Sequence, residues 1–292
     1  MSVYDKLGNK LNEVFDIDGL ELSHAYDIDG NEVLNKTPTA PTDLTVMTYN
    51  IGQWYTGNNA NVPTANYEQY YNLQRSIIFA YNPDIASFQE YYDPFSSGHT
   101  VDDVIGEYFT DHKNNATSGY KAKAIYSNGY ELSDYSETNF AVGNSRSYIK
   151  TSIQCEGRTI WLINAHLETS TYESAKVAES TELLNAVANL EYFIIMADFN
   201  TVCKSVNDEE YTTIMKQFID AGYHSANCSE QHGFIDTWTS GSSASGTWYP
   251  CDQIITSANI DINNVVADQT KVTDDIANAI DHIPLIAYVT VN

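Results

Sequence analysis

Hydrophobic and polar positions form two kinds of pattern that alternate along the chain from residue 43 onward. Short apolar runs rich in β-branched and aromatic residues predict strands, and the longer amphipathic stretches between them predict helices. The predicted strands cover residues 44–49, 85–88, 121–126, 148–154, 159–165, 193–197, 253–256 and 285–291. Strands that alternate with helices along a sequence are typical of an α/β protein.

Three amphipathic stretches also carry the signals of helix ends. The first covers residues 67–81 and stops before Asn82-Pro83, because proline does not continue a helix. Two pairs of residues have the spacing of a capping box and predict the starts of two more helices: Ser170 with Glu173, and Asn207 with Glu210. The helix after Ser170 is expected to run to about Asn189, and the last one to end before Gly222.

The first 33 residues contain a repeat with a period of 11, in which VYDKLGNKL, VFDIDGLEL and AYDIDGNEV follow one another. Each copy consists of two short extended runs around a D-x-x-G turn, which predicts a β-ribbon. A ribbon with open edges buries too little to stand alone, so we expect residues 1–34 to attach the protein to an assembly or to form a homo-oligomer. A semi-ordered leader is the alternative. The repeat has a weak similarity to short N-terminal repeats of phage tail-associated proteins, which makes a phage or virion component the expected assembly partner.

The remaining organisation follows from composition. Residues 35–42 contain two prolines among small polar residues and predict a linker, so that residues 43–292 form the main domain. The sequence has no apolar run of membrane-spanning length, and its start lacks the basic and apolar regions of a signal peptide. We therefore expect no membrane insertion and a protein made in the cytoplasm, with virion association or release as its later location.

The overall charge limits the partners of the protein. Of the 292 residues 42% are hydrophobic and 18% are charged, which excludes a disordered chain and a coiled coil. Lys and Arg total 14 against 39 Asp and Glu, a formal net charge of −25, which excludes a broad basic face for polyanions. Six of the fourteen basic residues fall between residues 113 and 158, so this stretch is expected to contact any phosphate-bearing ligand.

Polar residues lie directly at the ends of several predicted strands. In a layered α/β protein, residues at strand ends on one edge converge even when they are far apart in the sequence. The set consists of Asn50, Glu90, His166, Asp198, Asn200, Asp252, Asp281 and His282. Each alone is an ordinary turn former or structural residue, but together they supply four carboxylates, two amides and two imidazoles.

These residue types point to a metal-dependent reaction at a phosphate. Oxygen ligands without thiolates favour Mg²⁺ or Mn²⁺ over zinc, and a structural role for Ca²⁺ stays open. Clustered carboxylates need a cation to remain ionised together. With Arg146 as a fixed positive donor, the set supplies what phosphodiester hydrolysis requires: a metal for the phosphate, a base for water, and donors for the developing charge.

Six blocks of the sequence resemble those of the endonuclease/exonuclease/phosphatase superfamily of deoxyribonuclease I-like proteins, in the same order. The blocks are MTYN, SFQE, NAHLE, ADFN, CDQII and IDHIP, and the resemblance spans about residues 43–292. It implies a four-layer α/β sandwich, in which two packed mixed β-sheets are flanked by helices. It also implies that Glu90 is the principal metal ligand, with Asn50 and Asp281 completing the metal shell. Asp198 and Asn200 would orient water and phosphate.

The resemblance assigns roles to the other candidate residues as well. Asp252 would support His282, and His282 and His166 would stabilise the phosphoryl oxygens or transfer protons. Arg146 occupies the position of a phosphate-contacting arginine. Tyr120 falls where these nucleases present a tyrosine to the minor groove of DNA.

Two of the departures from the superfamily pattern bear on the roles of the candidate residues. Ala122 stands where deoxyribonuclease I-like enzymes have a glutamate that orients the first histidine, which leaves Glu168 as an alternative neighbour of His166. Tyr91-Tyr92 follow Glu90 where a groove-reading arginine would be expected. Of the two residues that would contact the minor groove of DNA, the sequence therefore has the tyrosine but not the arginine.

The four cysteines form no C-x-x-C pair, so a thiolate zinc site is not expected. Cys203 lies three residues after Asn200 and Cys251 directly precedes Asp252, so a Cys203–Cys251 disulfide would join two strand ends of the site. Cys228 is the competing partner. A disulfide would imply that the protein works outside a reducing cytosol.

The sequence as a whole predicts a divalent-metal-dependent phosphodiesterase, with DNA as the preferred substrate and endonucleolytic cleavage as the preferred activity. One alternative is a phospholipid or inositol-phosphate phosphodiesterase of the same superfamily. Another is a virion structural or binding module that uses the fold as a scaffold.

Overall fold

The computed structural model of the chain describes residues 3–4, 10–11, 24–26, 32–35, 41–52, 67–91, 100–115, 121–142, 146–169, 173–239, 247–267 and 281–292. Contacts within the chain divide it into two units, Met1–Ala40 and Pro41–Asn292. None of the described helices combines the length and the apolar character needed to cross a membrane.

The first unit contains two antiparallel pairs of short strands. Strand β1 (Val3–Tyr4) pairs with β2 (Lys10–Leu11), and β3 (His24–Tyr26) pairs with β4 (Glu32–Asn35). The first pair falls on the first copy of the 11-residue repeat and the second pair on the third copy. The middle copy lies outside the described residues.

The second unit contains two six-stranded sheets of mixed strand direction. The first sheet has the order β17-β18-β5-β6-β8-β7. Its strands are β5 (Thr42–Asn50), β6 (Ile85–Gln89), β7 (Asp111–Asn114), β8 (Lys123–Ser127), β17 (Ile260–Ala267) and β18 (Leu285–Val291). Strands β5 and β6 are parallel, and the other neighbours in this sheet are antiparallel.

The second sheet has the order β13-β16-β12-β11-β10-β9. Its strands are β9 (Ser133–Asn139), β10 (Ser147–Cys155), β11 (Arg158–His166), β12 (Phe193–Asp198), β13 (His224–Ser225) and β16 (Asp252–Thr256). Strands β11 and β12 are parallel, and the other pairs are antiparallel. A separate two-stranded ribbon is formed by β14 (Trp238–Thr239) and β15 (Trp248–Tyr249).

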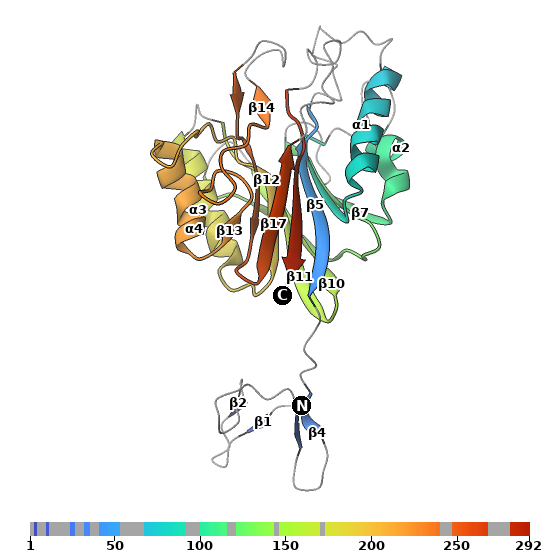
Figure 1. Cartoon of the computed structure of the whole chain (residues 1–292), viewed down its shortest axis with the longest axis vertical. Helices are drawn as coiled ribbons and strands as arrows, with labels where there is room; N and C mark the ends of the chain where they lie inside the picture. Colours follow the sequence, from blue (N-terminus) through green and yellow to red (C-terminus); the bar gives the residue numbers. More distant parts are fainter. Residues whose placement is uncertain are drawn as a thin grey trace. The chain divides into compact units, whose positions relative to one another are not determined.

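The two sheets pack face to face, and helices cover their outer faces (Figure 1). The sequence of β12 is apolar at every position before Asp198, because both faces of the strand are buried. Ile194 and Met196 belong to the core between the sheets, whereas Phe193 and Ile195 belong to the core beneath the outer helices. A strand that is buried on both faces reads as a continuous hydrophobic run rather than as an alternation.

The helices are divided between the two outer faces. On the first sheet lie α1 (Tyr67–Tyr81), α2 (Val101–Ile105) and the adjoining 3₁₀ turn η3 (Gly106–Tyr108). On the second sheet lie α3 (Glu173–Val187), the π-helical turn η6 (Tyr211–Met215) and α4 (Lys216–Asp220). The layer order helix, sheet, sheet, helix confirms the predicted four-layer α/β sandwich.

The structure differs from the sequence expectations in two instructive places. Strand β9 was not predicted, because it is an exposed edge strand whose sequence SDYSETN has no buried face to impose a hydrophobic alternation. The expected capping box of Asn207 and Glu210 is wrong, because the Glu210 carboxylate accepts from the Val202 amide and pairs with the Lys176 ammonium instead. The Ser170 capping box lies outside the described residues.

Candidate active site at the strand ends

The register of the strands places the sequence-predicted residues at one end of the two sheets. In the second sheet, His166 at the end of β11 lies opposite Asp198 at the end of β12, and Asp198 lies opposite Asp252 at the start of β16. In the first sheet, Asn50 at the end of β5 pairs with Gln89 at the end of β6, so Glu90 follows immediately. The face-to-face packing of the sheets then brings these two edges together.

Asp198 is the residue at which the two edges meet. Its Oδ2 accepts a hydrogen bond of 2.9 Å from Asn50 Nδ2, which comes from the other sheet. The same oxygen lies 3.4 Å from His166 Nε2 and 3.8 Å from His282 Nε2. Asp198 is 1% exposed, so these partners hold a buried carboxylate rather than a solvated one.

Glu90 lies beside Asp198, close to the Asp198 and Asp281 carboxylates. Its Oε1 lies 3.4 Å from Asn50 Nδ2. Burial raises the pKa of Glu90, and the Asp281 and Asp198 carboxylates raise it further, while His282 and Asn50 lower it. The main forces on Glu90 therefore disfavour its ionised form, and a cation bound beside it would reverse their effect.

His282 and Asp252 form a buried pair next to Asp198. His282 Nδ1 lies 2.9 Å from Asp252 Oδ2. Burial by itself lowers the pKa of His282, but the Asp252, Asp198 and Asp281 carboxylates outweigh it and raise the pKa to about 10. Burial raises the pKa of Asp252 to about 6, against the lowering effect of His282. Near neutral pH the pair is therefore an imidazolium and a carboxylate.

Asn200 is held against Asp198 by its own backbone. The Asn200 amide donates to Asp198 Oδ1 at 2.8 Å, and its side-chain Nδ2 donates to the Leu167 carbonyl at 2.8 Å. Its φ of 50° lies in the left-handed region, which non-glycine residues rarely adopt. The backbone turn after β12 therefore fixes both the direction of Asn200 and its distance from Asp198.

Arg146 and Glu168 lie together beside the site. Arg146 is 6% exposed, and its Nε lies 3.9 Å from Glu168 Oε1. Glu168 was the alternative neighbour considered for His166, whereas the carboxylate that lies 3.4 Å from His166 Nε2 belongs to Asp198. Tyr120, the other sequence-predicted substrate residue, lies outside the described residues.

Comparison with known proteins gives a consistent picture of this fold. No family model matches the sequence, and neither does any curated protein. Among solved structures, the chain is similar to an endonuclease/exonuclease/phosphatase family protein from Bacteroides thetaiotaomicron, with 14% identity, a TM-score of 0.63, and coverage of 87% of this chain and 97% of that one. The chain has the endonuclease/exonuclease/phosphatase fold. This finding confirms the fold implied by the six sequence blocks.

Two further structures show the same fold at low identity. TDP2 from D. rerio, complexed with a single-strand DNA product, has 12% identity and a TM-score of 0.66, with coverage of 85% of this chain and 99% of that one. ANGEL2, a 2′,3′-cyclic phosphatase, has 13% identity and a TM-score of 0.63, with coverage of 86% and 96%. At these identities the endonuclease/exonuclease/phosphatase fold is shared, and the chemistry has to be argued from this chain's own residues.

Two groups of side chains within this fold have the composition of a metal site. Asp198, Asp252 and His282 offer ligand atoms that all lie within 4.8 Å of one another. However, His282 Nδ1 needs its proton for the hydrogen bond to Asp252 Oδ2. These two atoms are therefore not available as metal ligands while the bond is made. Glu90, Asn50 and Asp281 offer carboxylate and amide oxygens, the donors that Mg²⁺ and Mn²⁺ prefer. The second group contains no imidazole or other cationic side chain, whereas His282 supplies positive charge to the first, so the second group fits a hard divalent cation better.

Sequence reasoning missed Gly52, which lies against the Glu90 carboxylate. The Gly52 amide donates to Asn50 Oδ1 at 3.0 Å. A Cβ atom at Gly52 would lie 2.0 Å from Glu90 Oε2, far inside van der Waals contact. The signal in the sequence was a glycine two residues after Asn50, where a close approach of the backbone requires the absence of a side chain.

The Gly52→Ala substitution is therefore expected to displace the Glu90 carboxylate and to weaken Mn²⁺ affinity by about 10- to 100-fold, the range for residues that orient metal ligands. Titration of Mn²⁺ into the purified variant measures this. Gly106→Ala is the matched control, because Gly106 has a helical φ of −57° and an added Cβ there would approach the Asp102 side chain no closer than 3.3 Å. Equal Mn²⁺ affinity in the two variants would contradict the role given to Gly52.

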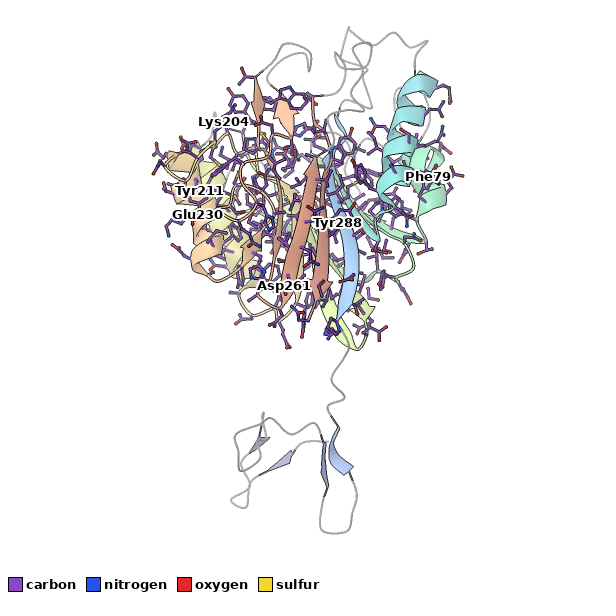
Figure 2. All side chains as sticks on the ribbon, in the orientation of Figure 1. Phe79, Lys204, Tyr211, Glu230, Asp261 and Tyr288 are labelled. Carbon is purple, nitrogen blue, oxygen red and sulfur yellow. The ribbon has the colours of Figure 1, made fainter. Side chains whose placement is uncertain are left out.

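An aromatic ribbon beside His282 was also missed. The Trp238 ring lies 6.3 Å from the His282 ring, and the Tyr249 ring lies 5.7 Å from Trp238. Lys204 Nζ lies 4.5 Å from the centre of the Tyr249 ring, and Lys204 is labelled in Figure 2. The available signal was a pair of short aromatic runs around a glycine- and serine-rich stretch, which is typical of a hairpin.

The structure does not contain the possible Cys203–Cys251 disulfide. All four cysteines lie in the described part of the chain as free buried thiols. Cys203 Sγ lies 3.2 Å from Cys228 Sγ, whereas Cys251 Sγ donates to the Thr201 carbonyl at 3.0 Å. The two thiols therefore have different neighbours: a thiol for Cys203 and a backbone carbonyl for Cys251.

Oxidation is therefore expected to join Cys203 to Cys228, with loss of one hydrogen from each thiol to an added oxidant such as diamide. The two sulfurs are already close, so little rearrangement is needed. Peptide mapping under non-reducing conditions after diamide treatment checks this. Cys155, which is also buried, serves as the internal control. A linked peptide that contains Cys251 would contradict the expectation.

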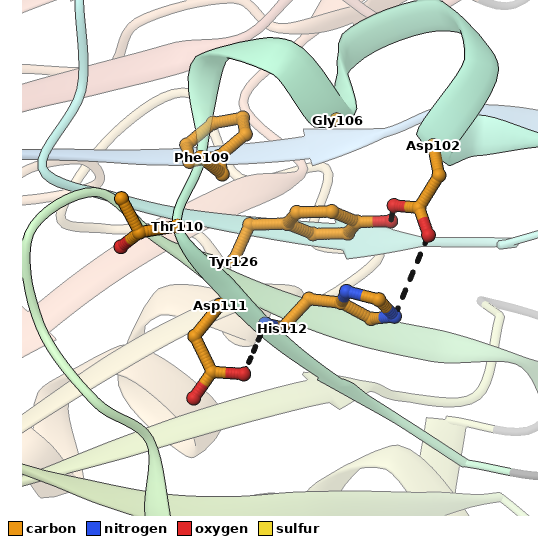
Figure 3. A pocket seen from close by; sticks show the side chains of 7 residues that line it. All are labelled: Asp102, Gly106, Phe109, Thr110, Asp111, His112 and Tyr126. Atoms are coloured by element: carbon orange, nitrogen blue, oxygen red, sulfur yellow. Dashed lines mark hydrogen bonds and ion pairs between the residues drawn. The ribbon is translucent and has the colours of Figure 1, made fainter.

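A hollow of about 310 Å³ lies away from the strand-end site. The His112 ring stacks on Tyr126 at 4.9 Å, and the Tyr126 hydroxyl donates to Asp102 Oδ1 at 2.8 Å (Figure 3). Tyr126 pairs with Ala86 near the start of β6, whereas Glu90 follows the end of that strand. The polar groups of this hollow bind one another, and none of the strand-end residues lines it.

Proposed function

We propose that the protein is a divalent-metal-dependent phosphodiesterase, and that its substrate is DNA cleaved endonucleolytically. The observation that carries the proposal is the meeting of Asn50, Glu90, Asp198 and His282 at one edge of the sandwich. Buried carboxylates are costly without partners, and a scaffold has no physical need for several of them in contact. A phosphodiesterase needs this combination of metal ligands and proton-carrying groups.

In this proposal Glu90, Asn50 and Asp281 hold a divalent cation such as Mg²⁺ or Mn²⁺. When bound, the cation polarises the phosphate and neutralises part of its developing charge. Asp198 accepts a proton from the attacking water, which Asn200 helps to orient. Its carboxylate is placed for this role by the hydrogen bonds from Asn50 Nδ2 and the Asn200 amide.

The histidines and Arg146 act on the other phosphate oxygens. His282 is held protonated and in one orientation by Asp252, so its Nε2 can donate to a phosphoryl oxygen as negative charge builds up there. His166 Nε2 lies 3.4 Å from the same Asp198 oxygen and provides a second donor. Arg146 supplies a fixed positive charge that needs no proton transfer.

A nucleic-acid substrate is supported by the aromatic ribbon. Trp238 and Tyr249 provide ring faces on which a base can stack, and Lys204 adds a positive charge for a neighbouring phosphate. TDP2 of D. rerio, which shares the fold, was solved with a single-strand DNA product. The net charge of −25 restricts such binding to a local strip beside the site.

Cleavage of supercoiled plasmid DNA with Mg²⁺ or Mn²⁺ tests the proposal, with EDTA and the His282→Ala variant as controls. Metal-dependent nicking that is absent from both controls supports a DNA endonuclease. Phospholipid vesicles and a 2′,3′-cyclic nucleotide are assayed in parallel, because ANGEL2 is a 2′,3′-cyclic phosphatase of the same fold. If one of these substrates were turned over and the plasmid were not nicked, the protein would be a phosphodiesterase whose substrate is not DNA. No turnover of any substrate, with no metal bound, would favour a scaffold.

The proposal extends to the N-terminal unit, which we assign to attachment on a phage or virion assembly. The support is the 11-residue repeat, with one short antiparallel strand pair on its first copy and one on its third. Deletion of residues 1–40 leaves β5 intact and tests this assignment. The truncated protein is expected to keep phosphodiesterase activity and to lose incorporation or self-association. Unchanged incorporation together with an unchanged oligomeric state would contradict the assignment of this unit to attachment.

A further inference from the structure

Lys176 and Glu210 form a buried ion pair behind the turn that carries Asn200. We infer that these two residues position Asn200 and Asp198 for catalysis, although neither contacts the substrate. This inference rests on the proposed phosphodiesterase function. It concerns residues that belong to none of the six sequence blocks.

The first observation is the place of Lys176 on α3. The buried face of this helix consists of Lys176, Glu179, Ser180, Leu183 and Val187, so a lysine occupies a position where an apolar residue would be expected. The Lys176 side chain is completely buried. Its ammonium makes an ion pair with the Glu210 carboxylate and donates to the Asn200 carbonyl at 2.9 Å.

The second observation is that Glu210 holds the same turn at its next amide. Glu210 Oε2 accepts from the Val202 amide at 2.5 Å. Lys176 and Glu210 therefore bind the two peptide groups that flank Thr201. Lys176 binds the carbonyl of the group before Thr201, and Glu210 binds the amide of the group after it. Thr201 itself is held by two further hydrogen bonds: its Oγ1 donates to the Pro250 carbonyl at 2.7 Å, and its carbonyl accepts from Cys251 Sγ at 3.0 Å.

The turn needs such support because its backbone is strained. Asn200 has a φ of 50°, in the left-handed region that non-glycine residues rarely adopt. In this conformation the Asn200 amide reaches Asp198 Oδ1 and its side chain reaches the Leu167 carbonyl. If the turn relaxed, both bonds would change, and the Asp198 carboxylate would lose one of the donors that orient it.

Stability alone does not account for the pair. Replacing a buried ion pair by apolar side chains of similar volume is often neutral or stabilising, because the desolvation of two charges offsets their attraction. An apolar pair cannot bind the Asn200 carbonyl or the Val202 amide. The two explanations therefore predict different outcomes for a double substitution.

The test compares Lys176→Met/Glu210→Leu with the wild-type protein. The double variant is expected to keep its melting temperature within a few degrees, to lose at least about 10-fold in kcat for a phosphodiester substrate, and to change KM less than about 3-fold, since small misplacements of catalytic groups mainly slow the reaction. Lys176→Arg is expected to recover part of the kcat, because the guanidinium can donate to both partners. Wild-type kcat in a folded double variant would overturn the inference.

The matched control is Lys216→Ala/Asp220→Ala. This removes an exposed ion pair on α4, with side chains that are 48% and 62% exposed, and is expected to leave kcat unchanged. Amide hydrogen exchange over residues 199–203 provides a readout that does not depend on activity. Faster exchange in the double variant than in the control supports the inference, and equal exchange contradicts it. Absence of all phosphodiester turnover in the wild-type protein would instead refute the proposed function, while the exchange comparison would still decide on the support of the turn.

Discussion

Replacement of Glu90 by Gln is expected to abolish divalent-metal binding, whereas replacement of His282 by Ala is expected to leave it intact and to lower kcat on the order of 10³-fold. Glu90 is a half-buried carboxylate whose ionised form is opposed by burial and by the Asp281 and Asp198 carboxylates, so loss of its charge removes a strong attraction for the cation. His282 is already engaged with Asp252, so its loss removes a donor to phosphate but no metal ligand. The two variants therefore separate binding of the metal from turnover.

Titration with Mn²⁺, followed by electron paramagnetic resonance, measures binding in both variants, and steady-state kinetics on the same preparations measures turnover. Glu191→Gln, a change at an exposed residue, is the control for loss of one negative charge. If His282→Ala lost Mn²⁺ and Glu90→Gln kept it, the metal would belong to the group of Asp198, Asp252 and His282 instead.

Replacement of Lys123 by Met is expected to stabilise the protein by about 2–4 kcal/mol at pH 7. Lys123 in β8 is fully buried, and its Nζ donates to the Lys121 carbonyl at 2.6 Å. Burial lowers the pKa of Lys123 to about 7, although the Glu137 carboxylate acts in the opposite direction. So low a pKa means that the partners of the Lys123 ammonium do not offset the cost of burying its charge. Methionine fills a similar volume without the charge.

The sign of the pH dependence follows from proton uptake. Between about pH 7 and the ordinary lysine pKa of 10.5, the unfolded chain binds a proton at Lys123 that the folded protein does not. The contribution of Lys123 to the free energy of unfolding therefore rises with pH in this window, by up to about 1.4 kcal/mol per pH unit. Below about pH 7 the full cost of the buried charge is present. The advantage of the Met variant should be largest there and should shrink toward pH 10.

Urea unfolding of both proteins between pH 6 and 10 checks this result, because other titrating groups cancel in the difference between variant and wild type. Lys216→Met, at an exposed position on α4, is expected to leave the free energy of unfolding almost unchanged at each pH, because an exposed ion pair contributes little. A Met variant less stable than wild type at pH 7 would show that the partners of Lys123 outweigh the cost of its burial.

The parts of the fold that the sequence predicted well are those that local physics determines. The strands that end at Asn50, His166 and Asp198 are continuous apolar runs followed at once by a polar residue, so both the strand and its end were visible. The edge strand β9 was not visible, because an exposed strand with polar side chains on both faces carries no hydrophobic period.

The candidate site divides in the same way. The polar residues at strand ends could be listed from the sequence, since sheet topology alone brings them to one edge. The contacts that arrange them could not. Glu210 has the spacing of a capping residue, but a buried lysine 34 positions earlier in the chain provides a stronger partner than the helix start. Cys203 and Cys228 meet because of a backbone turn that no spacing rule contains.

The position of β18 has a consequence for the order in which the protein is made. This strand lies between β17 and β5 in the interior of the first sheet, and Asp281 and His282 directly precede it. Strand β5 therefore emerges from the ribosome long before its neighbour exists, and one of its edges waits unpaired for most of the synthesis of the domain. Until β18 inserts, the proposed metal site lacks Asp281, and Asp252 lacks its partner His282. The candidate site is therefore expected to be one of the last parts of the domain to assemble, which makes closure of the first sheet a late, non-local step of folding.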